Sequence, residues 1–133
     1  MAGERARKKQ VLVVDDNHDA ADTLAMLLEA EGCECQTAYS GEEALALAER
    51  ELPDVVILDL CMPSMGGDQV ARALRSGPHG NEVTLVAHTA MSSYLQHDEV
   101  LEAGFDLHLV KPAPLDELIA LAQPGRRAAP NPG

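Results

Sequence analysis

Five polar side chains in this 133-residue sequence stand where short apolar runs end, and they are of the types that phosphoryl chemistry uses. They are three carboxylates, one hydroxyl and one ammonium: Asp15, Asp16, Asp59, Thr89 and Lys111. Two carboxylates about 5 Å apart repel each other by roughly 3 kcal/mol at an effective dielectric constant of about 20, so three brought together need a cation. A divalent ion such as Mg²⁺ binds one or two carboxylates and keeps positions for phosphate oxygens. With lysine and threonine to contact phosphate, one carboxylate of this set could receive a phosphoryl group.

The apolar runs that precede these residues predict buried strands. Five such runs occur along the chain, and four of them are continuous rather than alternating in polarity, which is typical of parallel strands covered on both faces. The predicted strands are Val11–Val14, a weaker one at Cys33–Ala38, Asp54–Asp59, Glu82–His88 and Leu107–Val110.

Amphipathic stretches between the strands predict helices. The sequence Ser40-Gly-Glu-Glu43 is a capping box that opens one of them. The predicted helices carry apolar faces at Ala21–Leu28, Ala44–Ala48, Val70–Leu74, Leu95–Ala103 and Leu115–Ala122. Five consecutive strand–helix units predict an α/β fold with an open, doubly wound, five-stranded parallel sheet. Ligands of such sheets bind at the carboxyl ends of the strands, so the five polar side chains are expected to meet there.

The charge of the chain excludes one class of partner. The formal net charge is −12, but the segment from Val11 to Gln123 holds 21 acidic and four basic residues, and Lys111 is its only lysine. Such a body repels phosphate backbones, so we expect no direct binding to nucleic acid. The sequence predicts a basic flexible arm over residues 1–10, one domain over 11–123 and a flexible tail over 124–133.

Short apolar runs and a charged beginning predict neither membrane insertion nor secretion, and hence a cytoplasmic location. The three cysteines are expected to be reduced, with Cys33 and Cys35 as core thiols. The histidines His18, His79, His88 and His97 show no metal-ligand spacing and are predicted to lie on the surface or at helix starts.

Four motifs, in this order, resemble the receiver domain of two-component response regulators. They are Val-Leu-Val-Val-Asp15-Asp16-Asn17, Ile-Leu-Asp59-Leu-Cys-Met62-Pro63-Ser-Met65-Gly-Gly67, Ala87-His-Thr89-Ala90 and Val110-Lys111-Pro112. The resemblance runs from about Val11 to Ala122, and the segment from Glu102 to Pro112 is most similar to receivers of hybrid sensor kinases. It implies a flavodoxin-like fold with strand order 2-1-3-4-5.

The resemblance also implies roles for individual residues. Asp59 would be the phosphoacceptor, taking its phosphoryl group from a phosphohistidine of a sensor histidine kinase or histidine phosphotransfer domain. Asp15, Asp16, Asp59 and the backbone carbonyl of Cys61 would hold Mg²⁺, for which Mn²⁺ can substitute. Thr89 and Lys111 would contact the phosphoryl oxygens, and His108 stands at the switch position. Such a protein is a signalling switch rather than an enzyme, and its downstream protein partner would bind the face formed by the fourth helix, fifth strand and fifth helix.

Two departures from the family pattern stand out. The family often has aspartate where this chain has Gly66, which is expected to loosen the turn from Met65 to Gly67. The switch position, usually tyrosine or phenylalanine, is His108.

Two other functions remain open from the residues. One is a small phosphohydrolase with an aspartyl-phosphate intermediate, although such enzymes usually carry Asp-x-Asp where this chain has Asp15-Asp16-Asn17. The other is a receiver-like interaction module that is never phosphorylated, against which the intact acidic and lysine set argues. A dinucleotide-binding domain is excluded because no glycine-rich loop follows the first strand.

Overall fold

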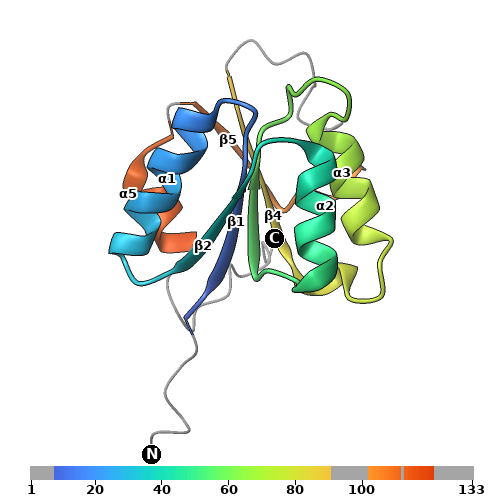
Figure 1. The fold of residues 1–133 in the computed structure, drawn as a ribbon, viewed down its shortest axis with the longest axis horizontal. Helices are drawn as coiled ribbons and strands as arrows, with labels where there is room; N and C mark the ends of the chain where they lie inside the picture. Colours follow the sequence, from blue (N-terminus) through green and yellow to red (C-terminus); the bar gives the residue numbers. More distant parts are fainter. Residues whose placement is uncertain (1–7, 91–101, 112, 122–133) are drawn as a thin grey trace, which may run out of the picture.

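A computed structural model describes residues 8–90, 102–111 and 113–121, and these form a three-layer α/β fold around a parallel sheet (Figure 1). The sheet order is β2-β1-β3-β4-β5, which confirms the predicted fold class. The strands are β1 (Gln10–Val14), β2 (Glu34–Ala38), β3 (Val55–Leu58), β4 (Thr84–Thr89) and β5 (Leu107–Val110). All four strand pairs are parallel, so their carboxyl ends meet at one edge.

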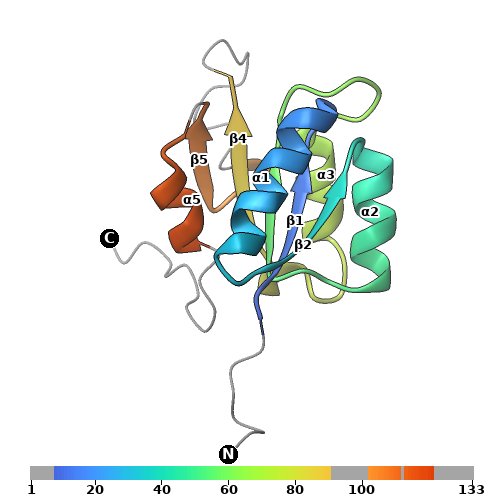
Figure 2. The same ribbon diagram turned by 60° about the vertical axis from the view of Figure 1, so that its left-hand side comes forward.

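Helices cover both faces of the sheet. Figures 1 and 2 show α1 and α5 on one face and α2 and α3 on the other. Their bounds are α1 (His18–Ala30), α2 (Gly41–Arg50), α3 (Gly67–Arg75) and α5 (Leu115–Leu121), with a short 3₁₀ helix η2 (Gly80–Glu82) before β4. The predicted fourth helix, Leu95–Ala103, lies outside the described residues except for its last two, Glu102 and Ala103, which are helical.

The strands are buried on both faces, as their continuous apolar runs predict. Val11 and Val13 pack toward α1 and α5, whereas Leu12 and Val14 pack toward α2 and α3. Each of these side chains is at most 2% exposed, and full burial of such a side chain stabilises a fold by about 1.5–3 kcal/mol. The two apolar layers hold the strand ends, and therefore the polar residues at them, in fixed positions.

Helix starts follow local polar chemistry. Asn17 caps α1, because its Oδ1 accepts a hydrogen bond from the Ala20 N–H at 3.1 Å. Ser40 caps α2 as predicted, its Oγ accepting from the Glu43 N–H. The Glu43 carboxylate reaches back one residue further than a capping box requires, to the N–H of Tyr39.

The structure differs from the sequence prediction at the start of β1 and at the start of β4. Gln10 joins β1 and Lys9 is buried, although both lie within the range predicted as an arm. The strand predicted from Glu82 begins instead at Thr84, because Gly80–Glu82 form η2. Arg75 fixes this turn by donating hydrogen bonds to the carbonyl oxygens of Gly80 and Val83. Among the described helices, none has the length and apolar character needed to cross a lipid bilayer.

Candidate functional site

The ends of four strands bring the predicted residues to one edge of the sheet. Backbone hydrogen bonds continue past the regular strands and fix these ends, with the Asp59 N–H donating to the Val14 carbonyl oxygen at 3.0 Å. The Lys111 N–H donates to the Thr89 carbonyl oxygen at 2.7 Å. Asp15 follows β1 directly, and Asp59 follows β3 directly. Because β1 and β3 are neighbours in the sheet, the two carboxylates lie side by side.

Three carboxylates form an acidic cluster at this edge. One carboxylate oxygen from each of Asp15, Asp16 and Asp59 lies within 4.8 Å of the others. Asp15 and Asp59 are buried and Asp16 is exposed, so the cluster opens to solvent on the Asp16 side. The Oδ1 atoms of the buried pair accept hydrogen bonds at 3.0 Å from backbone N–H groups, those of Asn17 and Cys61 respectively. Each of these two carboxylates is therefore held in orientation through its Oδ1, and its Oδ2 is left for other contacts.

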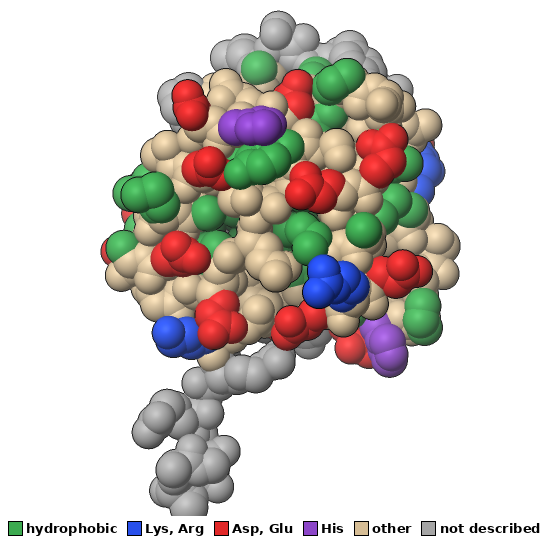
Figure 3. Space-filling model, viewed as in Figure 1, with side chains coloured by type: hydrophobic (Ala, Val, Ile, Leu, Met, Phe, Trp, Pro, Cys, Tyr) green, Lys and Arg blue, Asp and Glu red, His purple; other side chains and the backbone are tan. Residues whose placement is uncertain are grey.

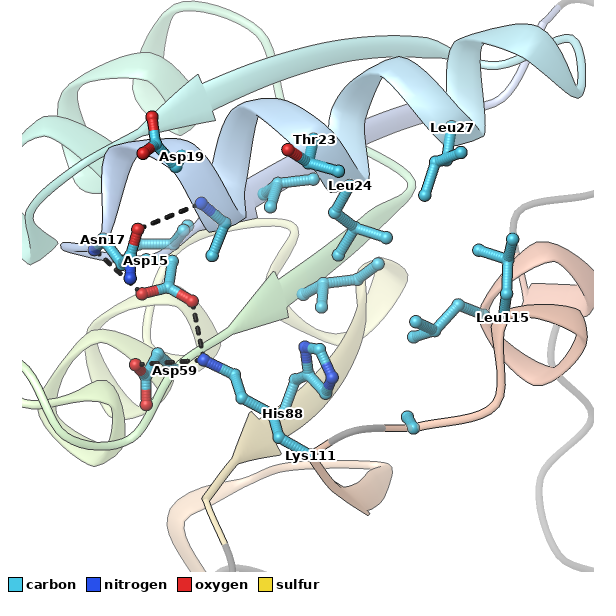
Figure 4. Close-up of a pocket in the computed structure, with 16 residues that line it drawn as sticks. Asp15, Asn17, Asp19, Thr23, Leu24, Leu27, Asp59, His88, Lys111 and Leu115 are labelled. Atoms are coloured by element: carbon cyan, nitrogen blue, oxygen red, sulfur yellow. Dashed lines mark hydrogen bonds and ion pairs between the residues drawn. The ribbon is translucent and has the colours of Figure 1, made fainter.

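Lys111 supplies the positive charge at the cluster. Its Nζ lies 2.7 Å from Oδ2 of Asp15 and 3.5 Å from Oδ2 of Asp59 (Figure 4). Burial lowers the pKa of Lys111, but the hydrogen bond to Asp15 and the negative charges of Asp59 and Asp15 outweigh it, so the pKa is raised overall. The lysine is therefore charged at neutral pH and bridges two carboxylates.

The pKa of Asp59 is raised above its usual value. Burial is the largest cause and the neighbouring Asp15 adds to it, while the Cys61 N–H and the Lys111 charge act in the opposite direction. A single lysine thus leaves the negative charge of the buried pair only partly compensated. A further cation at the cluster would favour the ionised form of Asp59.

The donor set fits Mg²⁺ or Mn²⁺. All three clustered ligands are carboxylate oxygens, which hard divalent ions prefer, and one side is open for water or phosphate oxygens. The side chain of Cys61 is exposed and its N–H is bonded to Asp59. The role of its carbonyl oxygen as a metal ligand stays a prediction.

Thr89 lies next to the site with an unused hydroxyl. Its side chain is fully buried, and its Oγ1 has no hydrogen-bond partner among the residues that the structure describes. His108 pairs in register with Ala87, two residues before Thr89, so both side chains lie on the same face of the sheet. The structure thus brings the predicted contact residue and the predicted switch residue to one face.

The loop after Asp59 packs tightly against the backbone of the site. A Cβ atom on Gly67 would lie 2.5 Å from the Asp59 carbonyl oxygen, and the Gly67 N–H donates to the carbonyl oxygen of Leu60 at 3.1 Å. The Gly66 N–H donates to Oε1 of Gln69, also at 3.1 Å. The turn that was expected to be loosened at Gly66 is therefore held at both glycines. Ser64 in this turn has a left-handed backbone conformation with a φ of 69°, which is uncommon for residues other than glycine.

The structure tests the positions predicted for two histidines and two cysteines. His18 begins α1 as predicted and stacks on the Tyr39 ring at a centroid distance of 3.8 Å. His88 was predicted to end a strand, and it does lie in β4, but the prediction that it lies at the surface or a helix start is wrong because its Nε2 is buried. Burial raises the pKa of both Cys33 and Cys35, the latter to about 12, which agrees with core thiols rather than metal ligands.

Two residues of this region were not predicted to have a role. Asn17 belongs to the first of the four motifs, and in the structure its side chain caps α1 and its N–H donates a hydrogen bond to Asp15. Its position directly after two aspartates and before a helix is a recognisable capping signal. His88 lies two residues after Val86 in β4, so both side chains point to the same face of the sheet. The alternation of faces along the predicted strand already indicates this.

Comparisons with known proteins agree with this geometry. Residues 11–123 match the family described as response regulator receiver domain. An uncharacterised 14.6 kDa protein of Leptolyngbya boryana is 39% identical over 113 residues, which are 85% of this chain and 86% of that protein. The transcriptional regulatory protein PrrA of Mycobacterium tuberculosis is 42% identical over 111 residues, 84% of this chain but 47% of PrrA. This chain therefore spans about half the length of that regulator. The solved chemotaxis response regulator CheY4 of Vibrio cholerae has a TM-score of 0.79 at 31% identity, covering 86% of this chain and 95% of CheY4.

Proposed function

Because this chain belongs to the response regulator receiver domain family, whose members are phosphoacceptors of two-component signalling, we propose that Asp59 is its phosphoacceptor and a phosphohistidine its donor. The observation that carries this proposal is the position of Asp59 within the acidic cluster and 3.5 Å from Lys111. Mg²⁺, or Mn²⁺ in its place, would be held by Asp15, Asp16, Asp59 and the carbonyl oxygen of Cys61. The ion would supply positive charge to the transferring oxygens.

The residues of the chain divide the transfer step between them. Oδ2 of Asp59 attacks phosphorus, the O–P bond forms, and the P–N bond of the phosphohistidine breaks with the electron pair returning to the imidazole. Oδ1 stays bonded to the Cys61 N–H, which keeps the carboxylate aimed during the attack. As negative charge passes from Asp59 to the phosphoryl oxygens, the Lys111 ammonium binds those oxygens in place of the Asp59 carboxylate. It keeps its shorter contact with Asp15 throughout.

The Thr89 hydroxyl supports a conformational readout of this step. A buried hydroxyl with no partner in the described part of the chain gains a hydrogen bond when a phosphoryl oxygen arrives. Movement of Thr89 would leave space on the sheet face that it shares with His108. The chain then shifts between two states at β5 and α5, where the downstream protein partner binds.

Partners and location follow from the same proposal. The donor is a sensor histidine kinase or a histidine phosphotransfer domain in the cytoplasm, and the acidic body makes direct nucleic-acid binding unfavourable. The chain is a signalling domain, as its family is, rather than a conventional enzyme.

Labelling with a small phosphodonor tests the proposal. The whole chain is incubated with acetyl phosphate and Mg²⁺ and analysed by mass spectrometry. We expect one labile adduct of about 80 Da, located on Asp59 and absent from Asp59→Asn, whereas the exposed-site control Asp116→Asn is labelled as the unaltered chain is. An adduct that persists in Asp59→Asn, or continuous turnover of phosphate monoesters, would contradict the proposal.

A further inference from the structure

Four neighbouring strands each place one polar side chain, at the carboxyl end of the strand, against a cavity of about 590 Å³ between α1 and α5. In the order of the sheet, from β1 through β3 and β4 to β5, these side chains belong to Asp15, Asp59, His88 and Lys111. The residue two positions before each of them packs into the apolar layer against α1 and α5. Because alternate residues of a strand share a face, the four side chains form one row across that face of the sheet.

His88 stands in this row between Lys111 and the carboxylates that Lys111 contacts. The register of β3 with β4 makes Asp59 and His88 neighbours, and β4 separates Asp59 from the strand that carries Lys111. The Lys111 ammonium nevertheless lies 3.5 Å from Asp59 and 2.7 Å from Asp15. Its aliphatic stem therefore crosses β4 at the position of His88.

Electrostatic attraction alone does not fix the position of this ammonium. Lysine carries its charge on a flexible four-carbon stem, and 29% of the Lys111 side chain is exposed, so a path to solvent is open. Other carboxylates compete for the charge, because Asp19 lines the same cavity and Figure 3 shows acidic side chains spread over the surface of α1 and α2. A side chain that closes the cavity side of the stem would remove these alternatives.

The ring of His88 has the place and the charge that this task needs. Figure 4 shows the ring beside Lys111, on the side nearer Leu24 and Leu115, which is the side of the cavity. Its Nε2 is buried. Burial, and next the charge of Lys111, lowers the pKa of His88, so the ring is neutral at neutral pH and does not repel the ammonium.

We propose that His88 is a positioning residue, whose ring confines the stem of Lys111 and so keeps the ammonium at the acidic cluster. This role rests on the proposed phosphoacceptor function and deepens it. The ammonium is needed where the phosphoryl oxygens arrive, and a charge that is already in place there needs no reorganisation during the transfer.

Removing the ring tests whether it acts on the transfer. His88→Val keeps a residue that suits a buried strand but is too short to cover the stem. We expect labelling of Asp59 by acetyl phosphate and Mg²⁺ to be about tenfold slower in this variant, and His88→Phe, which restores a flat ring, to recover most of the rate. Val86→Ala removes apolar volume from the same face of the same strand, so it should lower the urea midpoint without slowing the labelling.

A second substitution distinguishes positioning from a general structural effect. In a Lys111→Met background, His88→Val should slow labelling no further, because no ammonium remains to be positioned. A further loss of about tenfold in that background would mean that the two side chains act independently. Such a loss, or slow labelling in Val86→Ala as well, would overturn the proposal.

The ammonium of Lys111 gives a readout that does not depend on phosphorylation. The chain has three lysines, Lys8, Lys9 and Lys111, so their Nζ signals are few, and Lys111→Met assigns one of them. We expect the ¹⁵N shift of Lys111 Nζ at pH 7.5 to differ from that of the exposed Lys8 in the unaltered chain and in His88→Phe. In His88→Val it should move toward the Lys8 value.

The two measurements separate this proposal from the function on which it rests. An Nζ shift of Lys111 that is the same in His88→Val and in the unaltered chain would overturn the positioning role, whatever the labelling shows. If the Nζ shift moves as expected but Asp59 of the unaltered chain is not labelled, the proposed phosphoacceptor function fails instead.

Discussion

Asp15 and Lys111 are 96 positions apart in the sequence, and their side chains are joined by a 2.7 Å ion pair at the centre of the site. The pair joins residues that follow β1 and β5, which are separated in the sheet by β3 and β4, so it forms only when these four strands have assembled. Because Asp59 is the second carboxylate bonded to the same ammonium, Lys111 links the stability of the fold to the charge of the cluster.

Replacing Lys111 should destabilise the chain in a way that a metal ion reverses. Lys111→Met removes the ammonium and leaves Asp15 and Asp59 buried without it. We expect urea unfolding without Mg²⁺ to show a loss of roughly 2 kcal/mol, since hydrogen bonds to charged groups contribute about 1.5–3 kcal/mol. With saturating Mg²⁺, the difference in the free energy of unfolding between Lys111→Met and the unaltered chain should be smaller. Lys8→Met, at an exposed lysine, is the control and should be neutral; a loss that Mg²⁺ does not change would contradict the prediction.

The stability contributed by Asp59 should depend on pH. Its pKa is raised in the folded state, mainly by burial, so the folded chain binds this proton more tightly than the unfolded chain does. Stability from Asp59 is therefore present below its usual pKa and is lost as pH rises through the folded value. Without Mg²⁺, Asp59→Asn should have the higher urea midpoint at pH 7.5, and this advantage should shrink as the pH is lowered. If the difference in urea midpoint between Asp59→Asn and the unaltered chain does not change between pH 7.5 and lower pH, the charge of the Asp59 carboxyl is not its cause.

Metal affinity should depend on the exposed member of the cluster. Asp16→Asn removes one of the three carboxylates and should weaken Mn²⁺ or Mg²⁺ binding by at least about tenfold, measured by calorimetry. Asp19→Asn is the matched control, because Asp19 is also exposed and lies in the first turn of α1 but outside the cluster. Equal weakening by both variants would mean that the ion responds to overall charge alone.

The backbone contact at Gly67 should tolerate no side chain. Gly67→Ala places a Cβ atom 2.5 Å from the Asp59 carbonyl oxygen, so the loop that carries Asp59 must move. We expect a loss of about 2 kcal/mol in the free energy of unfolding, together with slower labelling by acetyl phosphate. Gly77→Ala meets its nearest atom only at 3.5 Å and should change neither quantity by much. Unchanged labelling in Gly67→Ala would separate this loop from the chemistry of the site.

Arg75 should be a main source of stability away from the site. It donates hydrogen bonds to the carbonyl oxygens of Gly80, Val83 and Gly104, and its Nη2 lies 2.8 Å from Asp106 Oδ2. Arg75→Ala should cost about 3 kcal/mol in thermal or urea unfolding, because three half-buried acceptors lose their donor. Arg72→Ala, at an exposed arginine of the same helix, should cost less than about 0.5 kcal/mol. Similar losses for both would contradict the assigned role.

The sequence predicted the features that depend on neighbouring residues, and it failed where a feature depends on contacts between distant parts of the chain. The continuous run Val11–Val14 predicted a doubly buried strand, and the position of Asp15 after it predicted the edge where the site lies. The start of β4 was predicted wrongly because it depends on η2 and on bonds from Arg75, whose acceptors are backbone carbonyls and leave no trace in residue type. His88 was misplaced because its surroundings come from two helices distant in the sequence.

Because β1 pairs with β3 in a fixed parallel register, the direction of the Asp59 side chain depends on the number of residues in β3. Leu58 pairs with Val14, and side chains alternate between faces along each strand. Deleting or inserting a single residue inside β3 would turn the Asp59 carboxyl toward the helices on the opposite side, with every atom of the aspartate still present in the chain. Relatives that keep this chemistry must therefore conserve the length of the strand as strictly as the identity of the residue that ends it.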